Sequence, residues 1–221
     1  MLRIASLAAV TVLTLFAFAP VRAAAGDPRE GVDYVKLASP QPPSQPGIEV
    51  IEFFSYACPH CNEFEPVVSK WRAGLPADVH FRRVPIGFGR PQWQAVAKLY
   101  YALEVSGDLA KLDHAVFSAL HVENVPLFDE KSILSWAGTR VADPKRFADA
   151  YRSFDVQTKT ARAELLAKTF DITGVPSLVV AGRYRVVGRE AKTFEELLKV
   201  TDQVIGIARR EIAPADAGKK K

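Results

Sequence analysis

The chain has 221 residues, which is enough for one sizeable domain, with or without an insertion. Of these residues, 48% are hydrophobic and 24% are charged, a composition that excludes a wholly disordered or fibrous protein. Its formal charge of +4 is spread along the chain, which argues against nucleic-acid binding, because that function needs a concentrated basic face. Two cysteines are too few for a disulfide scaffold, but they allow one disulfide, one redox pair or half of a metal site.

The N-terminal segment has the pattern of a cleavable secretory signal peptide. A positive residue precedes an uncharged apolar run at positions 4–19, and small residues ending at Ala23 or Ala25 offer cleavage sites. A membrane anchor is the alternative, but Pro20 and Arg22 interrupt the run before it reaches the about 20 residues that a spanning helix needs. We therefore predict an exported protein in an oxidising compartment, where cysteines tend to pair.

Strand signals follow the signal segment. Residues 26–47 are rich in Pro, Gly and Gln and predict an extended lead-in, with a candidate short strand at 34–37. Residues 48–54 are mostly β-branched and aromatic with apolar side chains on both faces, which is typical of a strand buried on both sides. Residues 78–84 alternate as a second strand.

A helix lies between these two strands. It is predicted to open at Cys58-Pro59, because proline is favoured in the first helical turn, where its missing N–H would have no partner. Cys61 and three later apolar residues share one face at helical spacing. Pro66 lies inside this helix and predicts a kink.

The middle of the chain changes character. Residues 91–163 carry apolar stripes at helical spacing and no strand-like alternation of any length. Asp143-Pro144 is a strong helix start, with a stripe that we extend to Phe154, and a further helix is predicted over 156–170.

The last part of the chain returns to strands. Residues 177–180 and 184–187 predict a hairpin around the turn Ala181-Gly182. Thr193 and Glu196 have the spacing of a capping box at the start of the final helix.

These elements define an α/β fold with one mixed β-sheet flanked by helices and an inserted all-helical domain. The predicted organisation is a signal peptide at 1–25, a discontinuous sheet domain at 26–90 and 164–212, the helical insertion at 91–163, and a polar, frayed tail at 213–221.

The motif Cys58-Pro59-His60-Cys61, after a strand and at a helix start, predicts redox chemistry. At the helix N-terminus, free N–H groups and the helix dipole stabilise the Cys58 thiolate, while Cys61 is one turn further on the buried face. We predict that Cys58 forms mixed disulfides, that Cys61 resolves them, that His60 supports the thiolate and that Pro59 restricts the ring. A Cys58 pKa near 4 would stabilise the reduced form by roughly 4 kcal/mol and raise the potential by roughly 90 mV.

Two other features complete the predicted site. Glu52 is a carboxylate in an apolar strand, so burial should raise its pKa and make it a proton acceptor or relay for Cys61, whereas Glu49 is predicted to be solvated. The peptide between Val175 and Pro176 is predicted to be cis, with the Val175 backbone facing Cys58 and available to pair with an extended substrate.

A metal or haem site is the alternative from another class of function. The cysteines supply only two of the four ligands that zinc prefers, and the histidines outside the motif lack ligand spacing. Haem attachment would need a histidine after Cys61, where Asn62 stands. We expect neither a metal nor a cofactor.

The segment from Glu52 to Cys61, with its Cys-Pro-His-Cys motif, resembles the active-site strand and helix start of the DsbA family of periplasmic thiol:disulfide oxidoreductases. Residues 174–176 resemble the family's cis-proline loop, and the insertion at 91–163 its helical domain. The resemblance implies a thioredoxin fold and donation of the disulfide to newly exported proteins. It also implies reoxidation by a DsbB-type, quinone-linked membrane oxidase. Nothing in the sequence indicates more than a monomer.

The sequence departs from the DsbA family at one point, and it leaves three alternative functions to consider. The family often pairs its buried acid with a lysine on the neighbouring strand, where this chain offers Arg82 or Arg83. A periplasmic isomerase usually carries an N-terminal dimerisation domain, for which residues 26–47 are too short. A reductase needs a more reducing dipeptide, and a non-redox binding module on the same fold has no need of both thiols.

Overall fold

The computed structural model describes residues 27–217, with side chains described up to Ile212, so the predicted signal peptide lies outside the described residues. Five strands form one mixed sheet in the order β1-β5-β4-β2-β3, in which only β2 and β3 are parallel. All five predicted strands are confirmed. They are β1 (Tyr34–Lys36), β2 (Ile48–Phe54), β3 (Val79–Pro85), β4 (Ser177–Val180) and β5 (Tyr184–Val186).

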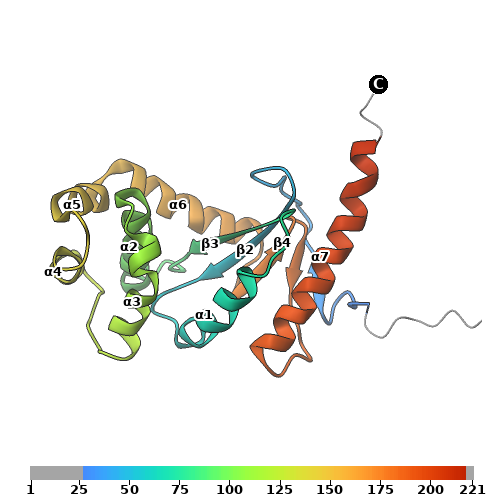
Figure 1. Cartoon of the computed structure of the whole chain (residues 1–221), viewed down its shortest axis with the longest axis horizontal. Coiled ribbons are helices and arrows are strands. Elements are labelled where there is room, and N and C mark those ends of the chain that lie inside the picture. The colour runs from blue at the N-terminus through green and yellow to red at the C-terminus, as the bar shows by residue number, and fades with distance from the viewer. Residues whose placement is uncertain (1–26, 218–221) are drawn as a thin grey trace, which may run out of the picture.

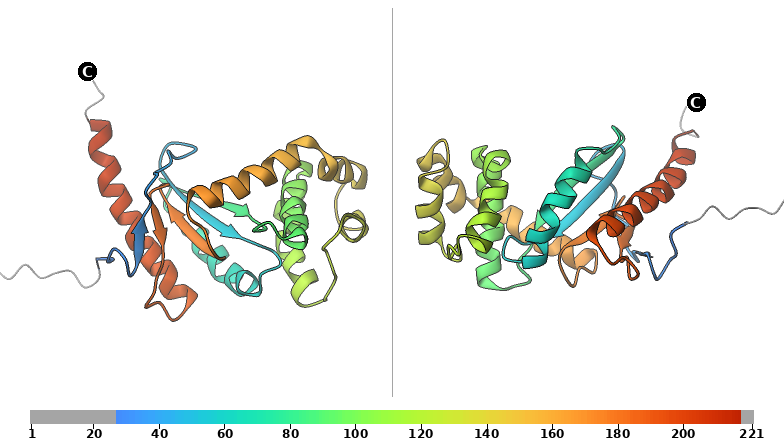
Figure 2. Two further views of the ribbon diagram at one scale, coloured as in Figure 1. Left: turned by 180° about the vertical axis from the view of Figure 1, so that it is seen from behind. Right: turned by 60° about the horizontal axis from the view of Figure 1, so that its bottom comes forward.

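Seven helices of the described residues surround this sheet. They are α1 (Pro59–Arg72), α2 (Pro91–Ser106), α3 (Leu109–His121), α4 (Glu130–Gly138), α5 (Pro144–Arg152), α6 (Phe154–Thr169) and α7 (Phe194–Ala217). Helices α1 and α7 cover one face of the sheet and α6 crosses the other, while α2 to α5 gather beyond one end of β2 (Figures 1 and 2). The mixed sheet with a helical insertion is therefore confirmed.

Strand β2 is the structural centre of the sheet. The predicted burial of both faces is confirmed, and every residue of the strand is buried, Glu49 included, because β2 lies between β3 and β4 and is covered on both faces. Val50 packs in one core cluster with Phe64 of α1, and Ile51 packs in another with Ala167 of α6. The loop after β2 leads directly into α1, so the end of this strand fixes where α1 begins.

The helical insertion is joined to the sheet without a break. A third core cluster combines α2, α3, α4 and α5 with Phe54 of β2 and with both cysteines. The expected boundary at residue 163 falls inside α6, whose later residues Ala163 and Ala167 pack against the sheet. The two cysteines thus lie where the insertion meets the sheet.

Two details of the insertion differ from the expectation. Helix α5 ends at Arg152, because the Ser153 side chain accepts a hydrogen bond from the N–H of Val156 and caps a new helix. Phe154 therefore does not continue the α5 stripe and is 82% exposed. Helix α4 was not predicted, although Asp129 caps it by accepting from the N–H of Ser132 at 2.8 Å.

The C-terminal part also refines the prediction. Ala181 and Gly182 form the expected turn with φ of 52° and 61°, and a Cβ on Gly182 would lie 2.1 Å from the Gln41 carbonyl oxygen, so glycine is required there. Thr193 accepts from the N–H of Glu196, but the Glu196 carboxylate accepts from Lys192 and not from Thr193, so the capping box is shifted. Helix α7 runs to Ala217, into the predicted tail.

None of the helices within residues 27–217 combines the length and the apolar character needed to cross a bilayer.

Candidate redox active site

The two cysteines occupy the first turn of α1. Cys58 is the N-cap residue in an extended conformation, and its carbonyl oxygen accepts hydrogen bonds from the N–H groups of Cys61 and Asn62, both at 3.1 Å. Pro59 takes the first helical position, as predicted. Cys61 is fully buried, whereas Cys58 retains 6% of its surface. Only Cys58 can therefore be reached by another molecule.

The environment of Cys58 favours the thiolate. Its pKa is lowered to about 6, mainly because the Cys61 thiol donates a hydrogen bond to it, against the opposing effect of burial. The N–H groups of Cys61 and His60 and the charge of His60 lower it further. This pKa is higher than the value near 4 that the sequence-based prediction assumed for Cys58. The His60 ring is mostly exposed, with Nδ1 3.2 Å from a Glu63 carboxylate oxygen, so it acts from the solvent side.

Cys61 has the opposite character. Burial raises its pKa far above the ordinary value of a thiol, and the hydrogen bond to Cys58 and the charge of Glu52 act in the same direction. A thiol in this state attacks a disulfide only if a neighbour takes its proton. The pair is thus asymmetric, with an accessible thiolate beside a buried thiol.

The Val175–Pro176 loop lies against Cys58. The peptide bond is cis, as predicted. The Cys58 thiol donates to the Val175 carbonyl oxygen at 3.5 Å, which confirms that the Val175 backbone faces the cysteine. The loop is held beside the pair although it is 117 residues away in the chain.

Glu52 lies on the face of β2 that α1 covers, as its alternation with Val50 requires. It is fully buried, and burial raises its pKa, against the opposing charge and hydrogen bond of Arg83. Arg83 stands opposite Glu52 in the β2–β3 register, and its Nε donates to Glu52 Oε2 at 2.8 Å. The arginine beside the buried acid is therefore Arg83.

The expectation that Glu49 is solvated was wrong. Glu49 is only 4% exposed, because Arg82 donates two hydrogen bonds to it, at 3.0 and 3.3 Å, and the Ser44 hydroxyl donates a third. Burial alone would raise its pKa, but these hydrogen bonds and the Arg82 charge lower it overall. Glu49 is thus a paired carboxylate on the sheet face opposite Glu52.

Three residues that the sequence did not single out complete the site. Asp113 of α3 accepts from Arg83 Nη1 at 2.7 Å and from the Tyr56 hydroxyl at 2.5 Å. His121 Nε2 lies 2.7 Å from the Tyr56 carbonyl oxygen, two residues before Cys58. Each contact joins residues at least 30 positions apart, so no local periodicity could indicate it.

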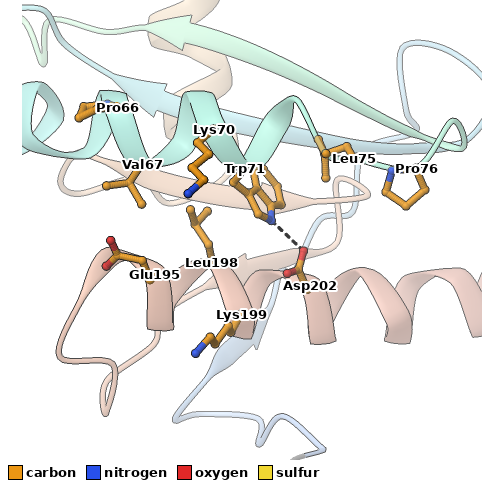
Figure 3. Close-up of a pocket in the computed structure, with 11 residues that line it drawn as sticks. Pro66, Val67, Lys70, Trp71, Leu75, Pro76, Glu195, Leu198, Lys199 and Asp202 are labelled. Atoms are coloured by element: carbon orange, nitrogen blue, oxygen red, sulfur yellow. Dashed lines mark hydrogen bonds between the residues drawn. The ribbon is translucent and has the colours of Figure 1, made fainter.

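Two of the surface hollows that border α1 are also lined by residues of α7. One of about 370 Å³ borders Glu63 near the start of the helix and is otherwise lined by the segment from Val187 to Leu197. The other, of about 590 Å³, lies between the second half of α1 and α7, where Trp71 donates to Asp202 at 2.8 Å (Figure 3). Because its α1 lining begins at Pro66, this second groove does not include the redox pair. Among the described residues, no three side chains of metal-ligating type cluster.

The low pKa of Cys58 predicts how the reduced protein responds to pH. Its alkylation rate, measured with excess iodoacetamide, should rise with pH around a midpoint near 6, whereas a midpoint near the ordinary 8.5 would contradict this account. Since the folded pKa is the lower one, the thiolate's contribution to stability is complete above about pH 8.5 and is lost as pH falls through 6. The oxidised protein, which has no free thiol, is the control.

Comparison with known proteins agrees with this geometry. A family model described as "DSBA-like thioredoxin domain" matches residues 49–199. The thiol:disulfide interchange protein DsbA of Pseudomonas aeruginosa is 40% identical over 83% of this chain and 87% of its own length. That of Pseudomonas syringae pv. tomato is 39% identical over 96% and 97%. The crystal structure of P. aeruginosa DsbA has a TM-score of 0.77 at 38% identity, covering 83% of this chain and 95% of the other.

The fold and the paired cysteines, together with these relatives, define a thiol-disulfide oxidoreductase with a thioredoxin fold. Within that class, the chain belongs to the DsbA-like family.

Proposed function

We propose that this protein donates a Cys58–Cys61 disulfide to newly exported, cysteine-containing proteins in the periplasm. The observation that carries the proposal is the asymmetry of the pair, in which an accessible thiolate of low pKa lies beside a fully buried thiol. The signal peptide predicted at 1–25, cleaved after Ala23 or Ala25, supports the exported location. The protein acts as a monomer in this proposal.

The transfer takes two steps. A client thiolate attacks the Cys58 sulfur, the Cys58–Cys61 bond breaks, and Cys61 leaves with the electron pair and takes up a proton. A second client thiolate then attacks the client sulfur of the mixed disulfide and releases Cys58 as a thiolate. The client loses two electrons and the protein gains them. A quinone-linked membrane oxidase of the DsbB type then removes these electrons.

The low pKa of Cys58 favours this direction, because it stabilises the reduced protein. Against an ordinary thiol, a pKa of about 6 stabilises the reduced form at pH 7 by about 1.4 kcal/mol, which raises the potential by about 30 mV. Little solvent screening applies, since Cys58 is 6% exposed. Pro59 contributes through the geometry of the first turn, and His60 contributes through its backbone N–H and its electrostatic effect on Cys58.

The client contacts are proposed at the Val175–Pro176 loop. An extended client segment would pair with the backbone of Val175, which gives affinity without side-chain selectivity. The hollow beside Glu63 lies near the start of the same helix and offers space for client side chains. Broad client choice follows from backbone pairing.

Glu52 is proposed to carry the proton of Cys61. It gives this proton when Cys61 leaves and takes it back when Cys61 attacks a mixed disulfide, and a pKa raised by burial suits both directions. Glu52→Gln should slow the resolution of a glutathione mixed disulfide by about 100-fold, measured by quenching and mass spectrometry. Glu49→Gln, on the other face of the same strand, is the matched control and should resolve at the wild-type rate. Equal rates in the two variants would contradict this role.

The function itself is tested by mixing the oxidised protein with a reduced, unfolded client. We expect rapid, stoichiometric transfer, with two client thiols lost for each protein disulfide consumed. A reductase or isomerase would behave differently, since its reduced form would cleave or rearrange client disulfides without net oxidation. That result would favour the alternative function.

A further inference from the structure

Arg83 donates hydrogen bonds to two carboxylates near the redox pair, those of Glu52 and Asp113. Arg83 Nε donates to Glu52 at 2.8 Å, and its Nη1 donates to Asp113 at 2.7 Å. The side chains of Arg83, Glu52 and Asp113 are 4%, 0% and 15% exposed. The guanidinium lies 3.8 Å from the centre of the Phe54 ring, so apolar surface fixes its place. Asp113 belongs to the helical insertion, and its two partners belong to the sheet.

The charges of this group do not balance. If both carboxylates are ionised, one buried negative charge is left over, and buried excess charge is costly. One bound proton removes it. Both oxygens of Asp113 have donors, Oδ1 the Tyr56 hydroxyl at 2.5 Å and Oδ2 Arg83 Nη1 at 2.7 Å, whereas Glu52 Oε1 has no hydrogen-bond partner among the described residues and has room to carry a proton. The proton therefore belongs on Glu52.

We propose that Asp113 is a positioning residue for the redox site: it shares Arg83 with Glu52 and thereby keeps Glu52 able to hold the proton that Cys61 needs. This inference rests on the proposed role of Glu52 as the proton carrier. It gives the helical insertion a part in the chemistry, since the insertion supplies the second carboxylate. Asp113 itself touches no reacting sulfur and acts through Arg83.

Other titratable groups face this cluster from every element packed on it. Helix α1 contributes Cys61, Glu65 and Arg72, helix α2 contributes Tyr100, Tyr101 and Glu104, helix α3 contributes His114, and strand β3 contributes Arg82. Arg83 and Asp113 line a hollow of about 570 Å³ between the sheet and the insertion, together with most of these groups. Among the described side chains, only Glu52 and Asp113 hydrogen-bond to Arg83.

The experiment titrates Glu52 by carboxyl ¹³C NMR in reduced, full-length protein, with the resonance assigned through Glu52→Gln. In the wild type, the Glu52 midpoint should lie above the ordinary value of about 4.3. Asp113→Asn removes the competing charge and releases Arg83 to Glu52 alone, so the midpoint should fall by about one pH unit or more. A midpoint that stays in place or rises would overturn the inference.

Two controls separate charge from structure. Asp113→Glu keeps the charge and should leave the midpoint close to that of the wild type. Glu104→Gln removes a carboxylate that lines the same hollow but pairs with Lys159, and it should also leave the midpoint in place. If Asp113→Asn does not fold, Asp113→Ser replaces it with the same expected fall.

A second readout links the titration to the chemistry. The pH midpoint for resolution of the glutathione mixed disulfide should move down in Asp113→Asn by the same amount as the Glu52 titration, and an unmoved profile would overturn the inference. The outcomes are separable from those of the proposed function. The titration needs no disulfide transfer, so an unmoved Glu52 defeats the inference alone, whereas wild-type resolution by Glu52→Gln defeats the proton-carrier role.

Discussion

Replacing Cys58 by serine is expected to abolish mixed-disulfide formation, whereas replacing Cys61 by serine is expected to trap it. In Cys58→Ser the remaining thiol is fully buried and has a strongly raised pKa, so it presents no accessible thiolate. In Cys61→Ser the accessible Cys58 remains, but no second sulfur can resolve the intermediate. Cys58→Ser should therefore form no mixed disulfide, and Cys61→Ser should form one stable mixed disulfide.

The measurement uses each reduced variant with excess oxidised glutathione at pH 7, followed by acid quenching and mass spectrometry of the intact protein. We expect one glutathione adduct per Cys61→Ser molecule and none for Cys58→Ser on the same timescale. The wild type should instead end as the internal disulfide. Adducts on Cys58→Ser at the rate seen for Cys61→Ser would contradict the assignment of the two roles.

Replacing Arg83 by methionine is expected to produce the largest loss of stability. The change leaves Glu52 and Asp113 without their shared cation, and breaking a buried ion pair from one side costs about 3–5 kcal/mol. For a chain of this size, that corresponds to a fall in Tm of about 6–20 °C, measured by thermal unfolding at pH 7. Adding Glu52→Gln and Asp113→Asn should recover most of the loss, because no unpaired charge then remains.

The matched control is Arg209→Met. Arg209 donates to Asp78 at 2.7 Å, but both side chains are nearly half exposed, and solvent-exposed ion pairs contribute little to stability. Equal losses in the two arginine variants would contradict the buried-network account, and so would a loss in Arg83→Met that neutralising the two acids does not relieve.

The sequence was most informative where local signals are strong. The apolar run at 48–54 and the Cys-Pro start of the next helix locate the redox pair, because strand, cap and first-turn proline are all local features. Glu49 was misjudged for a physical reason. A strand covered on both faces has no solvent side, so alternation cannot separate a paired carboxylate from a solvated one.

The sequence could not predict which residues pair with the buried charged side chains. Arg82 and Arg83 are adjacent, and only the β2–β3 register determines which of them faces Glu52. Asp113 reaches Arg83 from another layer of the fold, and nothing in its own helix indicates this. The end of α5 was also missed, because Phe154 continues an apolar spacing that the Ser153 cap interrupts.

Whether this protein donates its disulfide is tested most directly by the redox equilibrium between the Cys58–Cys61 pair and a series of glutathione buffers at pH 7. The fraction oxidised is read by fluorescence and thiol trapping. From its membership of the DsbA-like family we predict a potential near the about −120 mV of DsbA, to which the Cys58 pKa contributes about 30 mV, with the reduced protein the more heat-stable form. A potential near the about −270 mV of thioredoxin, with the oxidised protein more heat-stable, would contradict it.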